Sequence, residues 1–311
     1  MQSILETVLP IFGLVLCGYV VGRRGWMSEE AIKGLNTFVF YFAIPALLFR
    51  SMARGLGPVD LGIVGTYFTA VGATFLLALP LARFVFRTGV EVRGLLVMGS
   101  IYANTVMLGI PLVFAVMGDA GGVQLMLIIT FHGVTMLPVF TLLMELCRGA
   151  GQGWRNLAVS TARALAINPI ILALLSGIAF GQTGLVLPGA AERFLALLGA
   201  AAAPCALFAL GASLTSFEVR GDLKETLAVV AMKLAVHPAA TALFAFYVFD
   251  LPPLAAAVAI LTAACPVGAN VFIISRQYDI YLGRSASAVL ISTAVSLVSL
   301  TFLLAILRPS L

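Results

Sequence analysis

A succession of long apolar stretches, joined by short connections, constrains this chain more than any other feature. Of its 311 residues, 61% are hydrophobic and only 10% are charged, whereas a soluble domain carries about 25% charged residues. So few polar side chains cannot cover a water-facing surface, and so many apolar ones exclude disorder. The composition predicts an all-α integral membrane protein without a separate soluble domain.

The apolar runs are long enough to cross a membrane about ten times. A helix needs about 20 apolar residues to span the hydrocarbon core. The predicted spans are residues 3–22, 34–53, 59–86, 93–117, 121–147, 160–181, 189–215, 224–249, 253–276 and 285–307. The first basic residue, Arg23, follows the first run, whereas a cleavable signal peptide carries basic residues before its apolar run. We therefore expect the first run to be a membrane span.

Basic residues alternate between the two sides of this arrangement. The connections after spans 1, 3, 5, 7 and 9 hold 13 of the 18 Lys and Arg residues, and the opposite side holds four. Because cytoplasmic loops are enriched in Lys and Arg, this distribution predicts that both termini lie outside the cytoplasm. The predicted location of the protein is the cell inner (plasma) membrane. Since the basic residues lie between spans, the net charge of +5 reflects orientation in the membrane. Membrane lipids are expected partners, and nucleic acid is not.

Several motifs recur at an offset of 159 residues, which indicates an internal duplication. The matched positions are Pro10 and Pro169, Gly18 and Gly177, Gly25 and Gly184, and Pro45–Phe49 and Pro204–Phe208. Chance agreement is the alternative in a chain rich in Gly, Ala and Leu, but prolines and glycines in one register favour duplication. Each half would hold five spans, and an odd number gives the halves opposite orientations. Such inverted repeats are typical of secondary transporters, which bind substrate near the bilayer midplane.

Spans 4 and 9 each carry Pro, Gly and Asn near the middle of an otherwise apolar stretch. Proline removes a backbone donor, and glycine accepts non-helical dihedral angles. Because lipid offers no hydrogen bonds, backbone broken at this depth is expected to line a cavity, where half-helix N-termini favour an anion. The candidate substrate-binding residues are Asn104, Thr105 and Pro111 in span 4, and Pro266, Gly268 and Asn270 in span 9.

The breaks and the hydroxyls beside them each have a simpler, structural interpretation. Proline kinks padded by small residues are common in membrane helices, but breaks at equivalent positions of both halves favour a site. Hydroxyls beside the breaks could supply oxygen ligands to substrate or sodium, although in a helix they usually bond to their own backbone. These hydroxyls belong to Ser100, Thr105, Thr262 and Ser275.

Ionisable residues inside the spans are few and basic. None of the 13 acidic residues falls at mid-span, whereas Lys233 lies inside span 8, with His237 four residues later on the same face. Lys233 could snorkel to the headgroups, pair with helix carbonyls, or act as counter-charge to an anionic substrate. His237, and His132 in span 5, could couple protons or serve as hydrogen-bonded packing residues.

Taken together, these motifs resemble the auxin efflux carrier family, which contains bacterial malonate-type permeases and plant auxin exporters. The resemblance rests on Leu9–Phe12, Gly18–Tyr19, Gly25, Leu35–Tyr41, Pro45–Phe49, Asn104–Thr105, Gly109–Pro111, Asn168–Pro169, Leu210–Leu214, Lys233–Leu234, Pro238 and Pro266–Asn270. The plant carriers have a long hydrophilic loop between the halves. Here that connection is only about residues 148–160, so the chain resembles the compact bacterial type.

The resemblance implies an architecture related to bile-acid symporters and sodium–proton antiporters, with ten helices in two inverted five-helix repeats. Spans 4 and 9 would cross at unwound centres beside the substrate. Residues 1–55 and 149–217 would form scaffold helices 1–2 and 6–7, through which the family often forms homodimers. Residues 56–148 and 218–311 would form core helices 3–5 and 8–10, which move elevator-fashion.

The predicted function is secondary active transport of a small organic anion, either a mono- or dicarboxylate or an auxin-like acid. A channel or a transporter-derived sensor is the alternative, although a pore usually shows repeated polar rings along its path. A membrane enzyme is disfavoured, because the spans lack HExxH, paired aspartates and an Asp-rich prenyl motif. We expect no cofactor and no metal site.

Overall fold

The chain folds almost entirely into helices. The computed structural model describes residues 2–55, 60–148, 159, 162–163 and 166–307. Within these ranges every regular element is a helix, apart from one isolated β-bridge. This confirms the prediction of an all-α protein for the described part of the chain.

Six of the described helical stretches are long and apolar enough to cross a membrane. They are Glu29–Ala53, Gly62–Val85, Thr105–Cys147, Gly189–Ser216, Leu223–Tyr247 and Leu282–Leu307. Three shorter apolar helices accompany them: Leu9–Arg23, Pro169–Gln182 and Pro253–Ala264. Predicted spans 4 and 9 provide no continuous stretch of that length, because both are interrupted near the middle.

The chain divides into two compact units, and each unit combines segments from both halves of the sequence. The first comprises Met1–Val59, Val106–Met126 and Ala162–Ser216, and the second comprises Asp60–Thr105, Leu127–Thr161 and Phe217–Leu311. The long helix α6 (Ile110–Arg148) contributes to both units. Its dihedral angles are non-helical at Gly118 (φ 62°, ψ −157°), where the sequence predicts the connection between spans 4 and 5.

Short-range signals in the sequence set the helix boundaries of the first unit. Its helices are α1 (Gln2–Arg23), α2 (Glu29–Phe38), η1 (Val39–Ala43), α3 (Ile44–Ala53), α8 (Pro169–Gln182), α9 (Gly189–Ala200), α10 (Ala202–Ser213) and η4 (Leu214–Ser216). The Ser28 hydroxyl caps α2 by accepting from the Ala31 N–H at 3.2 Å. Asn168 caps α8 by accepting from the Ile170 N–H at 2.9 Å, with Pro169 at the first helical position.

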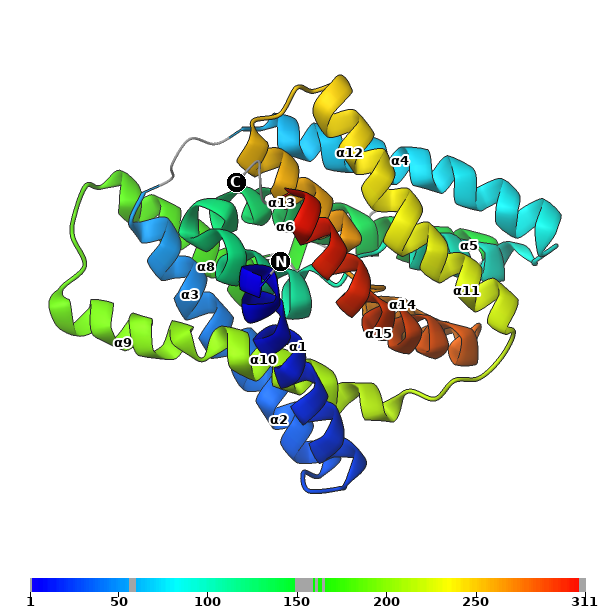
Figure 1. Ribbon diagram of the computed structural model, residues 1–311, viewed down its shortest axis with the longest axis horizontal. Helices are drawn as coiled ribbons and strands as arrows, with labels where there is room; N and C mark the ends of the chain where they lie inside the picture. The colour runs from blue at the N-terminus through cyan, green and yellow to red at the C-terminus, as the bar shows by residue number, and fades with distance from the viewer. Residues whose placement is uncertain (1, 56–59, 149–158, 160–161, 164–165, 308–311) are drawn as a thin grey trace. The chain divides into compact units, whose positions relative to one another are not determined.

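Glycines allow helices of the first unit to approach backbone to backbone. Helix α1 packs along α10, and α8 packs along α3 (Figure 1). A Cβ added at Gly18 would lie 2.0 Å from the carbonyl oxygen of Phe208, and one at Gly177 would lie 2.8 Å from that of Phe49. Gly18 and Gly177 are 159 residues apart, and so are Phe49 and Phe208. The same contact therefore occurs twice: the first half supplies the glycine in one case and the carbonyl in the other.

Both halves also end their first helix in the same way. Helix α1 is followed by Gly25 at φ 67°, and α8 is followed by Gly184 at φ 68°. Glycine adopts this left-handed conformation without steric penalty and commonly follows a helix for that reason. The two glycines are again 159 residues apart, so the repeat extends to backbone conformation.

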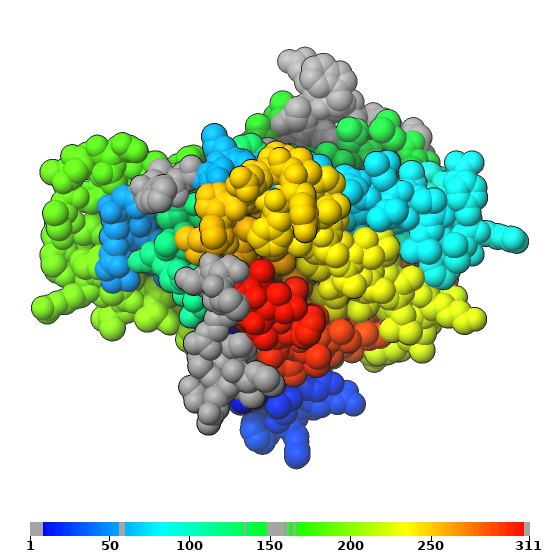
Figure 2. Space-filling view, turned by 45° about the horizontal axis from the view of Figure 1, so that its top comes forward, coloured from blue at the N-terminus to red at the C-terminus, as the bar shows by residue number. Residues whose placement is uncertain are grey.

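The second unit is built around an alanine-rich helix. Its helices are α4 (Gly62–Pro80), η2 (Leu81–Val85), α5 (Val90–Ile101), the second part of α6, α11 (Leu223–Ala231), η5 (Met232–Val236), α12 (His237–Tyr247), α13 (Pro253–Ala264), α14 (Asn270–Tyr278) and α15 (Leu282–Leu307). Every residue of α13 from Ala255 to Ala264 is buried. Helix α4 packs against α12, and Figure 2 shows them side by side, in cyan and yellow.

A π-helical turn interrupts two helices just before a proline. The turn η1 precedes Pro45, and η5 precedes Pro238. Proline lacks an N–H and clashes with the carbonyl one turn earlier, so a wider turn relieves the clash while the helix continues. In η5 this widened turn carries Lys233.

The close contact at Gly18 leads to a stability prediction. Gly18→Ala is expected to lower the Tm of the purified protein in detergent, because the added methyl carbon would overlap the Phe208 carbonyl. Overpacking of this kind costs about 1–3 kcal/mol, although alanine otherwise favours a helix. Gly13→Ala on the same helix is the control, since a Cβ there meets no atom within 4 Å. Equal Tm values for the two variants would contradict the close packing.

Candidate functional site

Two helices of the second unit lose their regular winding, as the sequence predicts for spans 4 and 9. Helix α5 ends at Ile101, and Tyr102 is extended (φ −79°, ψ 108°). Helix α13 ends at Ala264, and Cys265 is also non-helical (φ −58°, ψ 145°), with α14 beginning only at Asn270. The structure therefore confirms that both helices are broken.

The two breaks satisfy each other's backbone. The Asn104 N–H donates to the Pro266 carbonyl at 2.8 Å, and the Gly268 N–H donates to the Tyr102 carbonyl at 3.0 Å. These two bonds flank the antiparallel bridge between Ala103 and Val267. Within the second unit the breaks consequently lie side by side as a minimal two-stranded pair.

Proline and glycine have distinct roles in the second break. Pro266 lacks an N–H but still accepts through its carbonyl, so it interrupts α13 while keeping the bond to Asn104. A Cβ added at Gly268 would lie 2.7 Å from Cδ1 of Tyr102 and 3.2 Å from the Ala103 carbonyl oxygen. A side chain at this position would therefore require the Tyr102 ring to move.

Polar side chains gather where the breaks meet. The Asn270 amide donates to the Tyr102 hydroxyl at 2.7 Å. Asn104 and Thr105 are buried, with exposed fractions of 8% and 4%, while Asn270 is half-buried. The structure thus brings Asn104, Gly268 and Asn270 into one polar region with Pro266.

Pro111 is not in the first break. It is the second residue of α6 and follows the π-helical turn η3 (Thr105–Gly109). Proline is tolerated near the start of a helix, so the interruption is centred on Tyr102–Asn104 instead. A role of Pro111 in binding substrate remains a prediction.

The hydroxyls flanking the breaks mostly bond to their own helices. Ser100 donates to Leu96, Thr262 to Val258, and Ser275 to Val271, each through a carbonyl four residues earlier. This agrees with the structural interpretation of these residues. Their lone pairs stay available, but their hydroxyl protons are already engaged.

Two further residues complete the crossing and were not identified from the sequence as site residues. Ser292 on α15 accepts from the Val267 N–H at 3.0 Å, which satisfies a donor exposed by the break. Tyr102 holds Asn270 and also packs edge-on against His132, with ring centroids 4.6 Å apart. Tyr102 borders the Asn104 motif in the sequence, whereas nothing distinguishes Ser292 from the other hydroxyls of its helix.

The basic residues predicted inside the spans form one buried cluster. Lys233 and His237 are 0% exposed and His132 is 2% exposed, so Lys233 does not snorkel. The Lys233 ammonium lies 3.3 Å from Nδ1 of His237, and the Tyr67 hydroxyl lies 3.3 Å from Nδ1 of His132. Tyr67 bridges the two histidines, with ring centroids 5.9 Å and 5.5 Å away.

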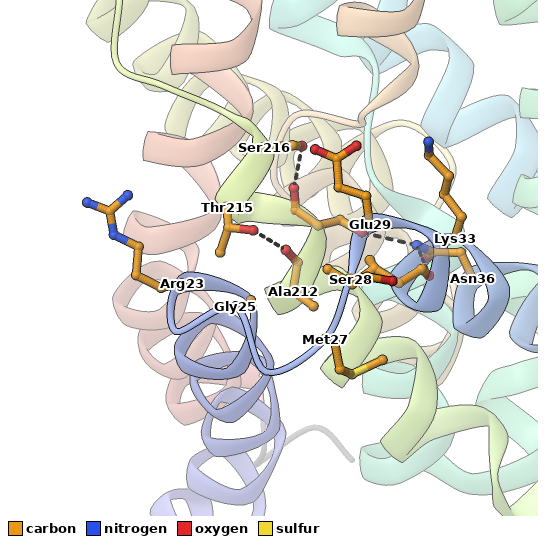
Figure 3. A pocket seen from close by; sticks show the side chains of 13 residues that line it. Arg23, Gly25, Met27, Ser28, Glu29, Lys33, Asn36, Ala212, Thr215 and Ser216 are labelled. Carbon is orange, nitrogen blue, oxygen red and sulfur yellow. Dashed lines mark hydrogen bonds between the residues drawn. The ribbon is translucent and has the colours of Figure 1, made fainter.

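A surface hollow of about 530 Å³ in the first unit is a weaker candidate (Figure 3). Arg23 and Lys33 border it, but both are exposed. Its hydroxyls on Thr215 and Ser216 donate to backbone carbonyls of α10. Because none of its polar lining residues is buried, the hollow has fewer features of a substrate site than the crossing.

The close approach at Gly268 gives a second prediction. Gly268→Ala is expected to lower the Tm by displacing the Tyr102 ring and weakening the paired backbone bonds. Gly72→Ala on α4 is the control, because a Cβ there has no neighbour within 4 Å. A Gly268→Ala variant as stable as Gly72→Ala would show that the crossing is looser than described.

Comparison with known proteins shows the family of this chain. A family model described as "Membrane transport protein", that of the auxin efflux carriers, matches residues 3–304. The chain belongs to this family. It is a multi-pass transmembrane transporter, and the family resemblance seen in the sequence motifs is confirmed.

Relatives of this transporter occur in bacteria, archaea and animals. "Putative malonate transporter" of Rhizobium meliloti is 32% identical, covering 99% of this chain and 97% of that protein. "Uncharacterized transporter" of Methanothermobacter thermautotrophicus is 29% identical over 95% of both chains. "Lysosomal cholesterol signaling protein" of Mus musculus is 26% identical, and the match covers 93% of this chain but only 36% of that protein. The first two names are those of transporters, which points away from an enzyme.

Proposed function

We propose that the protein is a secondary active transporter for a small organic anion, bound where the broken helices cross. The observation that carries this proposal is the backbone pairing of Asn104 with Pro266 and of Gly268 with Tyr102. Broken backbone is tolerated at membrane depth where it is buried in protein or lines a cavity. Carriers with broken helices bind substrate at such interruptions.

The chemistry of the crossing suits a carboxylate. Asn104 and Asn270 offer amide donors, and Thr105 adds a hydroxyl. Helix α14 begins at Asn270, so its first N–H groups and its dipole favour negative charge there. We therefore infer a mono- or dicarboxylate, or an auxin-like acid, as the substrate class.

We further infer two inverted five-helix repeats that divide into a scaffold and an elevator core. The repeated contacts of Gly18 and Gly177, and the shared conformation of Gly25 and Gly184, support the repeat. The division of the chain into two units supports the scaffold and core, with the addition that residues 106–126 group with the first unit. A homodimer through the scaffold helices belongs to the same proposal.

The proposed location is the cell inner (plasma) membrane, with both termini outside the cytoplasm. It is supported by the 13 basic residues on one side of the predicted spans against four on the other. Malonate is the first substrate to test, because the Rhizobium meliloti relative carries that name and spans nearly the whole chain.

Ligand binding can be tested by thermal shift of the purified protein. The screen compares malonate with other mono- and dicarboxylates, with and without sodium and at two pH values. A substrate that binds the folded state raises Tm with its concentration. Slow, saturable flux in proteoliposomes would then separate a carrier from a channel, which would give unitary currents, and from a sensor, which would give no flux.

Removing both amides at the crossing tests the site. The double variant Asn104→Ala plus Asn270→Ala is expected to weaken binding of the stabilising carboxylate at least about tenfold, because hydrogen bonds to a charged group contribute about 1.5–3 kcal/mol each. The measurement is the concentration dependence of the thermal shift, followed by transport in proteoliposomes.

Asn36→Ala provides the matched control, since Asn36 is a half-buried asparagine of the first unit that bonds to Ser213. This variant should bind the carboxylate as the parent does. Unchanged binding and transport by the double variant would overturn the site assignment.

A further inference from the structure

Lys233 is the one lysine of the described chain that is fully buried. Its exposed fraction is 0%, and it lies in the widened turn η5 of the second unit. An ammonium group at this depth costs a few kcal/mol unless it is paired. A buried lysine therefore needs polar partners.

That contact is a backbone carbonyl released by the break in α13. The Lys233 ammonium donates to the Ala263 carbonyl. In a continuous helix this carbonyl would accept from the Val267 N–H, but that N–H donates to Ser292 instead. The carbonyl lies at the C-terminal end of a half-helix, where the dipole is negative and a cation is favoured.

No carboxylate of the described chain pairs with Lys233. The buried carboxylate two turns earlier on the same helix, Glu225, is engaged with Arg284 at 2.8 Å. The other ionisable neighbours are His237 on α12, His132 on α6, and Tyr67, Tyr102 and Cys265. The Lys233 ammonium therefore contacts the freed carbonyl of the broken helix and Nδ1 of His237, and no carboxylate of the described residues neutralises it.

Carriers built from broken helices bind their coupling cation at this kind of place, between unwound carbonyls and the C-terminal end of a half-helix. We propose that the Lys233 ammonium is a built-in cation that occupies this position, so that the carrier needs no sodium ion at the crossing. The inference deepens the proposed transport function and relies on it for its physiological meaning. Its structural test requires no substrate.

The test compares Tm values of purified protein in equal concentrations of choline, sodium and ethylammonium chloride. Wild type and Lys224→Ala, which removes an exposed lysine of the same helix, are expected to give the same Tm in all three salts. Lys233→Ala should melt lower in choline and regain about 2–4 °C in sodium or ethylammonium, because a small cation can enter the vacated position. Lys233→Arg should resemble wild type.

Lys233→Met separates charge from packing, because it keeps an unbranched apolar stem without the ammonium. It should melt below wild type in choline, because the charge is lost, and gain nothing from ethylammonium, since its stem fills the space. If Lys233→Ala cannot be purified, the Tm of Lys233→Met tests the proposal alone: a Tm below wild type supports it and a wild-type Tm contradicts it.

Three results would overturn the proposal: a wild-type Tm for Lys233→Met, a Lys233→Ala variant that does not respond to either small cation, or wild-type protein stabilised by sodium over choline. Malonate uptake into vesicles that increases with an inward sodium gradient would also contradict it. Failure to transport any carboxylate would leave these Tm values unchanged, so the two proposals can fail separately.

Discussion

Backbone hydrogen bonding in a medium without water is the constraint on which this structure depends. Lipid offers no partner to an N–H or C=O group, so a helix can break at depth only if other groups pair its backbone. In the second unit the breaks at Tyr102–Asn104 and Cys265–Ala269 pair with each other. Ser292 and Lys233 engage a further donor and acceptor that the break in α13 releases. The polar centre of this unit thus follows from the breaks themselves.

The first unit relies instead on closely packed helix pairs. Gly18 and Gly211 allow α1 and α10 to approach until only backbone separates them, and Gly177 does the same for α8 on α3. Close packing of small residues holds membrane helices together where no hydrophobic driving force acts between them. The first unit therefore contains tight helix pairs and the second an internal polar crossing, and this difference supports the proposal of a scaffold and a core.

Much of this could be predicted because it depends on residues that have strong local effects. The helical class followed from apolar runs, and the breaks followed from Pro266, Gly268 and their counterparts in span 4. Other features could not be predicted, because they depend on three-dimensional neighbours. Pro111 was a candidate residue of the crossing together with Asn104, yet the chain unwinds seven residues before Pro111, where the Asn104 N–H donates to the Pro266 carbonyl. Lys233 could have snorkelled, but it is buried and donates to the Ala263 carbonyl. Ser292 carries no sequence pattern of its own.

Disulfide trapping between the two breaks tests the central claim most directly. Ala103 and Val267 form a non-hydrogen-bonded antiparallel pair, in which Cα atoms lie about 4.5 Å apart, within the range that a disulfide spans. With Cys265→Ala as background, the pair A103C and V267C should oxidise rapidly, and mass spectrometry should find the linked peptides. The pair A103C and A256C, whose second position lies within α13 and 11 residues before Val267, should not link. Equal, slow oxidation of both pairs would mean that the broken helices do not cross.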